Sequence, residues 1–170
     1  TTGWWPKGGD FTPSSTPIQD AVNNASSGDV ICVGDGTYNE NVDVNIANLT
    51  IKSENGTANC IVSASNSSDH VFYVTASYVN ITGLTVKNAT GGGVGIYLKA
   101  ASYGNISGNN VTNNYYGIVL SYSNNNTLTN NTALNNTQEG IELSYSSNNT
   151  LTNNTALNNT NYGIYLRSSN

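Results

Sequence analysis

The sequence predicts an all-β fold, a single-stranded parallel β-helix, from three observations: a 23-residue repeat, apolar residues that alternate along each copy, and asparagines at equivalent positions of successive copies. The run GIVLSYSNNNTLTNNTALNNTQE at 117–139 returns as GIELSYSSNNTLTNNTALNNTNY at 140–162. Diverged copies begin at Gly95 and Gly163, so we expect coils of about 22–25 residues. A unit of this size cannot bury its own apolar face and must stack on its neighbours.

The apolar residues of each copy follow the two-residue period of a β-strand rather than the spacing of a helix. The alternating pairs are Ile118 and Leu120, Ile141 and Leu143, and Ile164 and Leu166. A second apolar pair follows in each copy, such as Leu128 and Ala133, after small polar residues that can turn the chain. Each copy is therefore expected to form several short strands joined by corners.

Asparagine occupies 31 of the 170 positions, and stacking at a constant period places many of these residues above one another. The expected stacks are Asn109, Asn131 and Asn154, and Asn88, Asn113, Asn135 and Asn158. A side-chain amide both donates and accepts, so stacked amides can form continuous hydrogen-bonded ladders. The tyrosine pairs Tyr78/Tyr103 and Tyr122/Tyr145 are expected to stack in the same way.

The N-terminal segment, residues 1–29, differs from the single domain of coils expected over 30–170. Thr16, Pro17 and Gln19 have the arrangement of a capping box. Apolar residues then recur at helical spacing, at Ile18, Ala21, Val22 and Ala25. We expect a short helix that ends at Gly28 and covers the open end of the coil stack, with the first strand near Val30.

The segments that carry a family resemblance are IQDAVNNASSGDVICVGDGTYNENV, LTIKSENGT, VNITGLTVKN and the iterated GIxLxxSxNNTLTNNT. From about residue 15 onward the chain resembles the pectin-lyase-like superfamily, especially its NosD-like carbohydrate-binding and sugar-hydrolysis repeats. Asn-rich proteins of this kind are similar to surface and secreted proteins of archaea, notably methanogens. The resemblance implies a right-handed coil and a location outside the cytoplasm, but no single activity, since the superfamily includes lyases, hydrolases, esterases and adhesins.

Composition argues against nucleic acid as a partner, because the net charge is −5 and the five Lys and Arg residues form no basic stripe. No apolar stretch approaches the roughly 20 residues of a membrane span. Cys32 and Cys60 lie too far apart for a CxxC motif, and we expect them to form a disulfide between adjacent strands. Such a bond indicates an extracellular or cell-surface protein.

The N-x-S/T glycosylation pattern occurs fourteen times and supports the same location. Its asparagines are Asn24, Asn48, Asn55, Asn66, Asn80, Asn88, Asn105, Asn110, Asn125, Asn130, Asn135, Asn148, Asn153 and Asn158. The abundance of Asn, Ser and Thr accounts for part of this number.

No metal or cofactor is expected. Copper, which the NosD-like resemblance suggests, prefers His, Met or thiolate ligands, and the chain has one His, two Cys and no Met. Acidic residues near the first coil, at Asp29, Asp35, Glu40 and Asp43, either serve turns or hold a calcium ion, and the turns at Gly28 and at GDG (34–36) account for them without metal.

No catalytic residues are predicted. Lyases and hydrolases of this superfamily use clustered acids, whereas residues 91–170 contain only Glu139 and Glu142. If Ile141 and Leu143 point inward, Glu142 faces outward. It then lies on the same sheet as Tyr97 and Tyr165, either as a solvated surface residue or as a carbohydrate contact. The candidate carbohydrate contacts are Tyr73, Tyr97, Glu142 and Tyr165.

The function expected first is a structural or adhesive surface glycoprotein that associates head-to-tail with copies of itself into a fibre or surface assembly. The candidate contacts are Trp4, Trp5, Ile164 and Leu166, because the sequence stops directly after a predicted strand. The other interpretation of this end is that the coils continue in a longer polypeptide. The two tryptophans either mark this contact surface or fold back onto the helix. The alternative function is a module that binds or cleaves polysaccharide.

Overall fold

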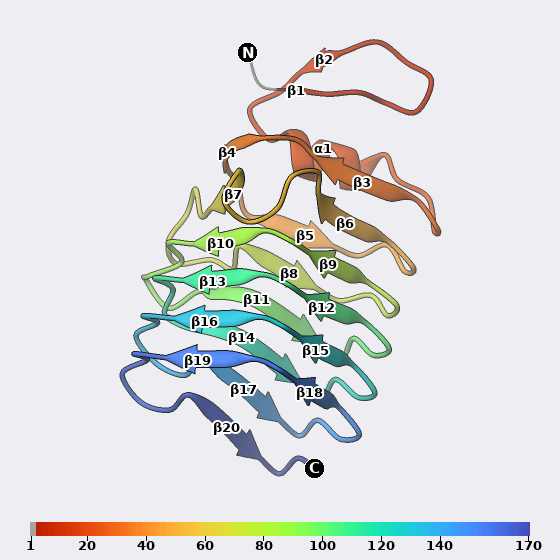
Figure 1. The fold of residues 1–170 in the computed structure, drawn as a ribbon. Coiled ribbons are helices and arrows are strands. Elements are labelled where there is room, and N and C mark those ends of the chain that lie inside the picture. Colours follow the sequence, from red (N-terminus) through yellow and green to blue (C-terminus); the bar gives the residue numbers. More distant parts are fainter. Residues whose placement is uncertain (1–2) are drawn as a thin grey trace.

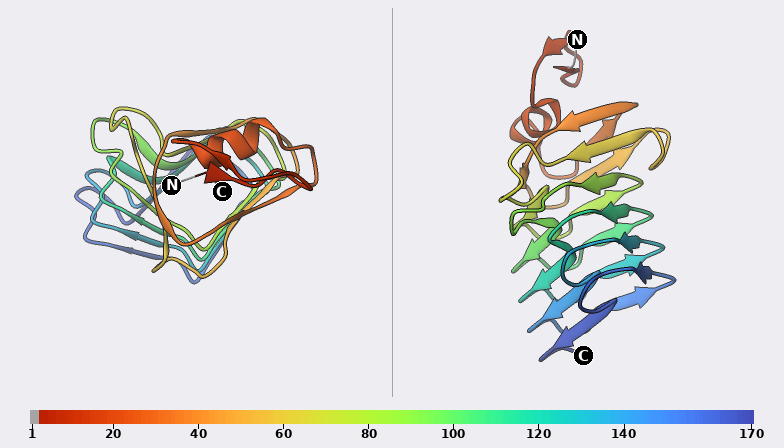
Figure 2. Two further views of the ribbon diagram at one scale, coloured as in Figure 1. Left: turned by 90° about the horizontal axis from the view of Figure 1, so that it is seen from above. Right: turned by 90° about the vertical axis from the view of Figure 1, so that its left-hand side faces the viewer.

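The computed structural model describes residues 3–170 as a right-handed parallel β-helix of stacked coils, as the sequence predicts (Figure 1). Each strand pairs in parallel with its equivalent one coil away, which produces three six-stranded sheets. The view from above in Figure 2 shows the coils as one continuous tube, with the N-terminal segment over one end. We name the three sheets after their first strands.

The β3 sheet contains β3 (Val30–Val33), β6 (Thr50–Ser53), β9 (Asn80–Thr82), β12 (Asn105–Ser107), β15 (Thr127–Thr129) and β18 (Thr150–Thr152). The β4 sheet contains β4 (Gly36–Asn39), β7 (Cys60–Ser63), β10 (Thr85–Lys87), β13 (Asn110–Thr112), β16 (Thr132–Leu134) and β19 (Thr155–Leu157). The β5 sheet contains β5 (Val42–Val44), β8 (Phe72–Val74), β11 (Val94–Lys99), β14 (Tyr116–Ser121), β17 (Ile141–Ser144) and β20 (Ile164–Arg167).

Coil length is less regular at the N-terminal end than the repeat suggests. In the β3 sheet, Ile106 pairs with Leu128, an offset of 22 residues. By contrast, Val30 pairs with Thr50, an offset of 20, and Ile51 pairs with Ile81, an offset of 30. The strands keep their register while the corner loops absorb the difference in length.

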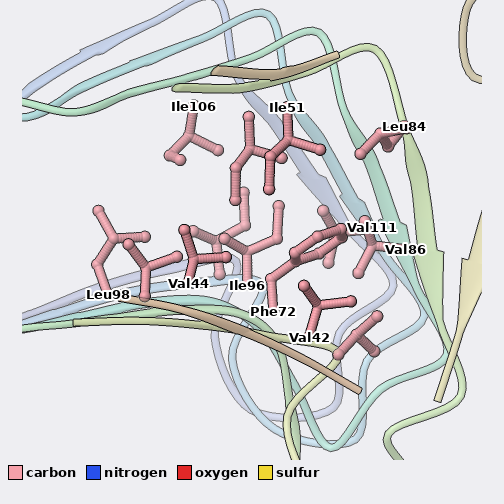
Figure 3. Close-up of a cluster of buried hydrophobic side chains, with 14 of the residues drawn as sticks. Val42, Val44, Ile51, Phe72, Leu84, Val86, Ile96, Leu98, Ile106 and Val111 are labelled. Atoms are coloured by element: carbon pink, nitrogen blue, oxygen red, sulfur yellow. The ribbon is translucent and has the colours of Figure 1, made fainter. Parts of the chain in front are cut away.

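The core is a column of apolar, mostly aliphatic side chains that point into the tube from all three sheets (Figure 3). Ile51, Ile106 and Phe72 are fully buried in it. Burial of each such side chain contributes roughly 1.5–3 kcal/mol, so the column dominates the stability of the coils. On the last coil the equivalent residues Ile164 and Leu166 are 46% and 53% exposed, since no further coil covers them within the described chain.

One of the two predicted asparagine stacks is a hydrogen-bonded ladder. The Nδ2 of Asn109 donates to Oδ1 of Asn131 over 3.1 Å, and Nδ2 of Asn131 donates to Oδ1 of Asn154 over 3.0 Å. The second predicted stack, Asn88, Asn113, Asn135 and Asn158, is wrong as an amide ladder. These side chains are exposed, and the residues serve the corners with left-handed φ values between 54° and 72°.

An unpredicted ladder lies one residue after that second stack. Asn114 donates through Nδ2 to Oδ1 of Asn136 over 3.3 Å, and Asn136 donates to Asn159 over 3.0 Å. Both tyrosine stacks are confirmed. The ring centroids of Tyr78 and Tyr103 are 5.0 Å apart, and those of Tyr122 and Tyr145 are 5.1 Å apart.

The N-terminal segment consists of a short hairpin, β1 (Gly3–Trp4) with β2 (Thr12–Pro13), and helix α1 (Pro17–Asn23). The helix is shorter than predicted: it ends at Asn23, well before Gly28. The predicted capping box is also absent, since Thr16 makes no side-chain cap hydrogen bond. Among residues 3–170, no helix is long and apolar enough to cross a membrane.

The predicted disulfide between Cys32 and Cys60 is wrong, because both residues are free thiols. Cys32 lies on β3, is exposed and pairs in register with Lys52. Cys60 lies on β7, in a different sheet, is buried and pairs with Gly36. A separation of 28 residues exceeds one turn of this first coil, so the two cysteines occupy different sheets and opposite faces of their strands.

Candidate functional site

The predicted carbohydrate contacts lie in one line on the outer face of the β5 sheet. Strand register places the following residues next to one another, one per coil: Asp43, Tyr73, Tyr97, Val119, Glu142 and Tyr165. We call this set the outer ladder. Tyr73, Tyr97, Glu142 and Tyr165 are each half-buried, with one side open to solvent. The sequence analysis therefore identified residues that the fold brings together.

His70, which is not among the predicted site residues, packs beside the upper part of the outer ladder. Its ring centroid lies 4.8 Å from that of Tyr97 and 5.3 Å from that of Tyr73, and the two tyrosine rings are 5.5 Å apart. Three rings therefore form one cluster on the surface. His70 precedes β8 in a loop, so strand alternation gave no signal for it.

The imidazole of His70 is fixed by the backbone. Its Nδ1 accepts a hydrogen bond from the Val94 N–H over 3.1 Å, which requires an unprotonated Nδ1. Burial lowers the pKa of His70, and the charge of Lys99 acts in the same direction, while Asp69 and Asp43 oppose both. At neutral pH the cluster is uncharged, and its aromatic surface can contact apolar ring faces.

The lower part of the outer ladder combines acids with aromatic rings. Glu139 and Glu142 lie on the same coil, and Glu139 is flanked in register by Tyr116 on one neighbouring coil and Tyr162 on the other. The rings of Tyr162 and Tyr165 stack with centroids 5.2 Å apart. Burial raises the pKa of Glu142, the nearby charge of Glu139 raises it further, and Arg167 lowers it.

A separate cavity of about 800 Å³ lies at the N-terminal end, between the hairpin, α1 and the first coil. Trp4, Ile18, Ile31 and Cys32 are among its mainly apolar walls. Trp5 is 71% exposed and packs on Phe11, with ring centroids 4.6 Å apart. Trp4 is partly buried and Trp5 is exposed, and both line this cavity.

The acids near the first coil serve structural contacts. Glu40 accepts hydrogen bonds from helix N–H groups, Asp29 accepts one from the Ser26 N–H, and Asp35 accepts one from Asn55. Asp43 belongs to the outer ladder. Within residues 3–170, no three His, Cys, Asp or Glu side chains are grouped in a way that could hold a metal ion.

All fourteen N-x-S/T asparagines are at least partly exposed. In each N-N-T corner, the first asparagine turns the chain and the second points inward: Asn130 is exposed with φ 56°, while Asn131 is 1% exposed. The corner geometry thus accounts for the spacing of these acceptors, in addition to any glycosylation.

The architecture defines the chain as a right-handed parallel β-helix. The family profile described as "Periplasmic copper-binding protein (NosD)" matches residues 22–170, and the chain belongs to this family. The family description is consistent with an extracellular or periplasmic location. No curated protein matches the sequence.

Two solved structures share the fold. An alginate lyase from Paenibacillus sp. str. FPU-7 has a TM-score of 0.74 and 21% identity, covering 91% of this chain and 63% of the lyase. A pectin methylesterase variant in complex with a hexasaccharide has a TM-score of 0.55 and 13% identity, covering 83% of this chain and 62% of the esterase. The chain spans less than two thirds of either protein, and similarity at this level shows the fold alone.

The residues of this chain do not fit the copper ion named in the family description. Copper sites combine several His, Met or thiolate ligands. His70 is packed against two tyrosine rings with its Nδ1 already bonded, and the two thiols lie on separate sheets. We therefore derive no chemistry through copper.

Proposed function

We propose that this chain is a polysaccharide-binding module of a surface or secreted protein, and that the outer ladder is its binding face. This was the alternative in the sequence analysis. The observation that carries it is the shared register of Tyr73, Tyr97, Glu142 and Tyr165, with His70 packed beside the first two.

The arrangement suits a sugar chain that runs along the helix axis. Successive ladder residues are about 4.8 Å apart, the spacing of paired strands, so a linear glycan would meet one ladder residue after another. Tyrosine rings supply apolar surface for sugar rings, and their hydroxyls and Glu142 supply hydrogen bonds. Binding requires no catalytic geometry, and we propose no reaction.

Glycan-array binding followed by calorimetry tests this function. Tyr97→Ala should reduce affinity about two- to tenfold, because aromatic contacts of this kind contribute roughly 0.5–1.5 kcal/mol beyond their area burial. Tyr103→Ala is the matched control, since Tyr103 is an exposed tyrosine at a corner away from the outer ladder. The proposal fails if no glycan binds, or if Tyr103→Ala abolishes binding and Tyr97→Ala does not.

A second candidate function is self-association, proposed because apolar groups are exposed at both ends of the coil stack. On the last coil Leu157, Ile164 and Leu166 are between 46% and 57% exposed, and Trp5 is exposed at the other end. The edge of β20 offers backbone groups on which another strand can pair. Association would be head-to-tail, because the two ends differ, and it could extend into a fibre or surface assembly.

Light scattering across a concentration series tests self-association. Growth of the apparent mass that Leu166→Asp and deletion of residues 1–12 both suppress would support it. A monomer at every concentration would exclude it, and the glycan-binding proposal would be unaffected.

A further inference from the structure

We propose that the glycan recognised by the outer ladder is an amino-sugar polymer, whose ammonium group is received by the carboxylates of Glu139 and Glu142. The inference rests on the proposed glycan-binding function and names the chemical class of its ligand. Three features of the lower part of the outer ladder support it: an unpaired carboxylate, the tyrosine side chains around it and the negative local charge.

The Glu139 side chain is the first feature. It is only 7% exposed, yet within residues 3–170 its carboxylate has no hydrogen-bond or ion-pair partner. Within residues 3–170, Oδ1 of Asn110 is the only polar side-chain atom that is both fully enclosed and without a hydrogen-bond partner. The Glu139 oxygens also lack a partner, so they are not fully enclosed and solvent still reaches them. Buried acids are normally paired because an unpaired charge is costly away from water. A carboxylate that is unpaired yet reachable from solvent is available to a cationic ligand.

The second feature is the aromatic surround. Tyr116 and Tyr162 occupy the positions next to Glu139 on the adjacent coils, and Tyr165 occupies the position next to Glu142. Burial raises the pKa of Tyr116, and the charges of Glu139 and Glu142 raise it further. Ring faces combined with carboxylates are a typical environment for ammonium groups.

The third feature is the local charge. Arg167 is the cation whose charge acts on Glu142, but it forms no ion pair with either glutamate in the described chain and instead lies over the Tyr145 ring at 5.7 Å. Two carboxylates thus face one cation, on a protein of net charge −5. A polymer of uronic acids would be repelled here, whereas a polymer of amino sugars would be attracted.

The test compares two oligosaccharides that differ in N-acetylation, which removes the positive charge of each amino group. Hexamers of glucosamine and of N-acetylglucosamine are titrated calorimetrically into the full chain in mildly acidic, low-salt buffer, with a galacturonate hexamer as the anionic probe. The glucosamine hexamer should bind about tenfold more tightly than the N-acetylated one. Added salt should reduce this preference, because exposed charges are screened.

Substitutions show which side chains cause the preference for the glucosamine hexamer over the N-acetylated hexamer. Glu142→Gln and Glu139→Gln should each reduce the preference for the glucosamine hexamer about threefold or more, because each removes one negative charge near the ammonium group. Glu54→Gln removes the same charge from an exposed site outside the outer ladder and should change nothing. Because Glu139 is buried, thermal melting checks that its variant folds, while the half-exposed Glu142 supplies a variant less dependent on that check.

The outcomes separate the two proposals. Equal affinity for the two hexamers, or tighter binding of galacturonate, overturns the amino-sugar inference, and the glycan-binding function stands if Tyr97→Ala still weakens binding. A preference that survives in both glutamate variants also overturns it. Absence of binding to any glycan overturns both.

Discussion

The carboxylate of Glu40 accepts a hydrogen bond of 3.1 Å from the backbone N–H of Ile18, at the start of helix α1. Its second oxygen accepts one of 2.9 Å from the Gln19 N–H. A residue of the first coil thus provides the N-terminal cap that the sequence assigned to Thr16. In turn, the Gln19 side chain accepts a hydrogen bond from the Asp43 N–H, so the helix and the first coil each accept hydrogen bonds from the other.

Glu40→Ala should destabilise the fold by about 2–4 kcal/mol, because two helix N–H groups lose their acceptors in a fully buried position. Glu40→Gln keeps the shape and one acceptor oxygen and should cost less. Urea unfolding measures both. Glu54→Ala, at an exposed site, should stay within about 0.5 kcal/mol of the wild type, and an equally small effect of Glu40→Ala would contradict the capping role.

The Glu40 pKa gives this contact a pH dependence. Burial raises the pKa of Glu40 above the usual carboxyl range, although its two backbone hydrogen bonds lower it. The folded state therefore holds the proton more tightly than the unfolded state. The contribution of Glu40 to the free energy of unfolding is therefore fully present below its pKa in the unfolded state. It is lost as pH rises through its pKa in the folded state. The stability difference between wild type and Glu40→Gln should widen on acidification, and a narrowing would show that the ionised form is the favoured one.

Asn131→Ala should cost about 2–3 kcal/mol, since Asn131 links Asn109 to Asn154 and also donates to the Ile106 carbonyl over 2.7 Å. Asn130→Ala, one residue earlier, removes an exposed side chain at a left-handed corner and should cost only about 1 kcal/mol, through backbone strain. Denaturant unfolding of the pair measures the difference. Equal costs would show that the amide ladder contributes little.

The fold could be predicted from the sequence because the 23-residue repeat carries both strand alternation and corner residues. Ile118 and Ile141 pair in register as that period requires. Where copies diverge, the period no longer predicts which sheet a residue joins. A 28-residue spacing assigned Cys32 and Cys60 to adjacent strands, whereas the first coil is 20 residues long in the β3 sheet. Corner loops have no periodic signal, so their lengths must be seen in the structure.

The candidate site was predicted in part for the same reason. Alternation predicts that Tyr97, Glu142 and Tyr165 share one outward face, and the structure shows these three and the further candidate Tyr73 in one ladder. His70 was missed because it lies in a loop, where side-chain direction does not follow a two-residue period. Only its ring contacts reveal its position.

His70 should titrate with a pKa below its ordinary value, which NMR can follow directly because the chain contains one histidine. Since the folded pKa is lowered, the contribution of His70 to stability is present above the unfolded pKa, about 6.5, and is lost as pH falls through the folded pKa. Protonation also removes the acceptor for the Val94 N–H. His70→Gln should therefore reduce the loss of stability in this pH range. A midpoint at or above 6.5 would contradict the buried, neutral ring.

The two cysteines should differ sharply in reactivity. Cys32 is exposed on the outer face of β3, so a thiol reagent should modify it in the folded protein. Cys60 is fully buried, and its Sγ lies 3.1 Å from the carbonyl oxygens of Val33 and Gly34, so it should react only after unfolding. Cys32→Ser should leave stability within about 0.5 kcal/mol of the wild type, and a reducing agent should leave the melting temperature unchanged. One thiol titrated under native conditions and two in denaturant would fit this structure, whereas none in either condition would require a covalent link between two strands that the register holds in different sheets.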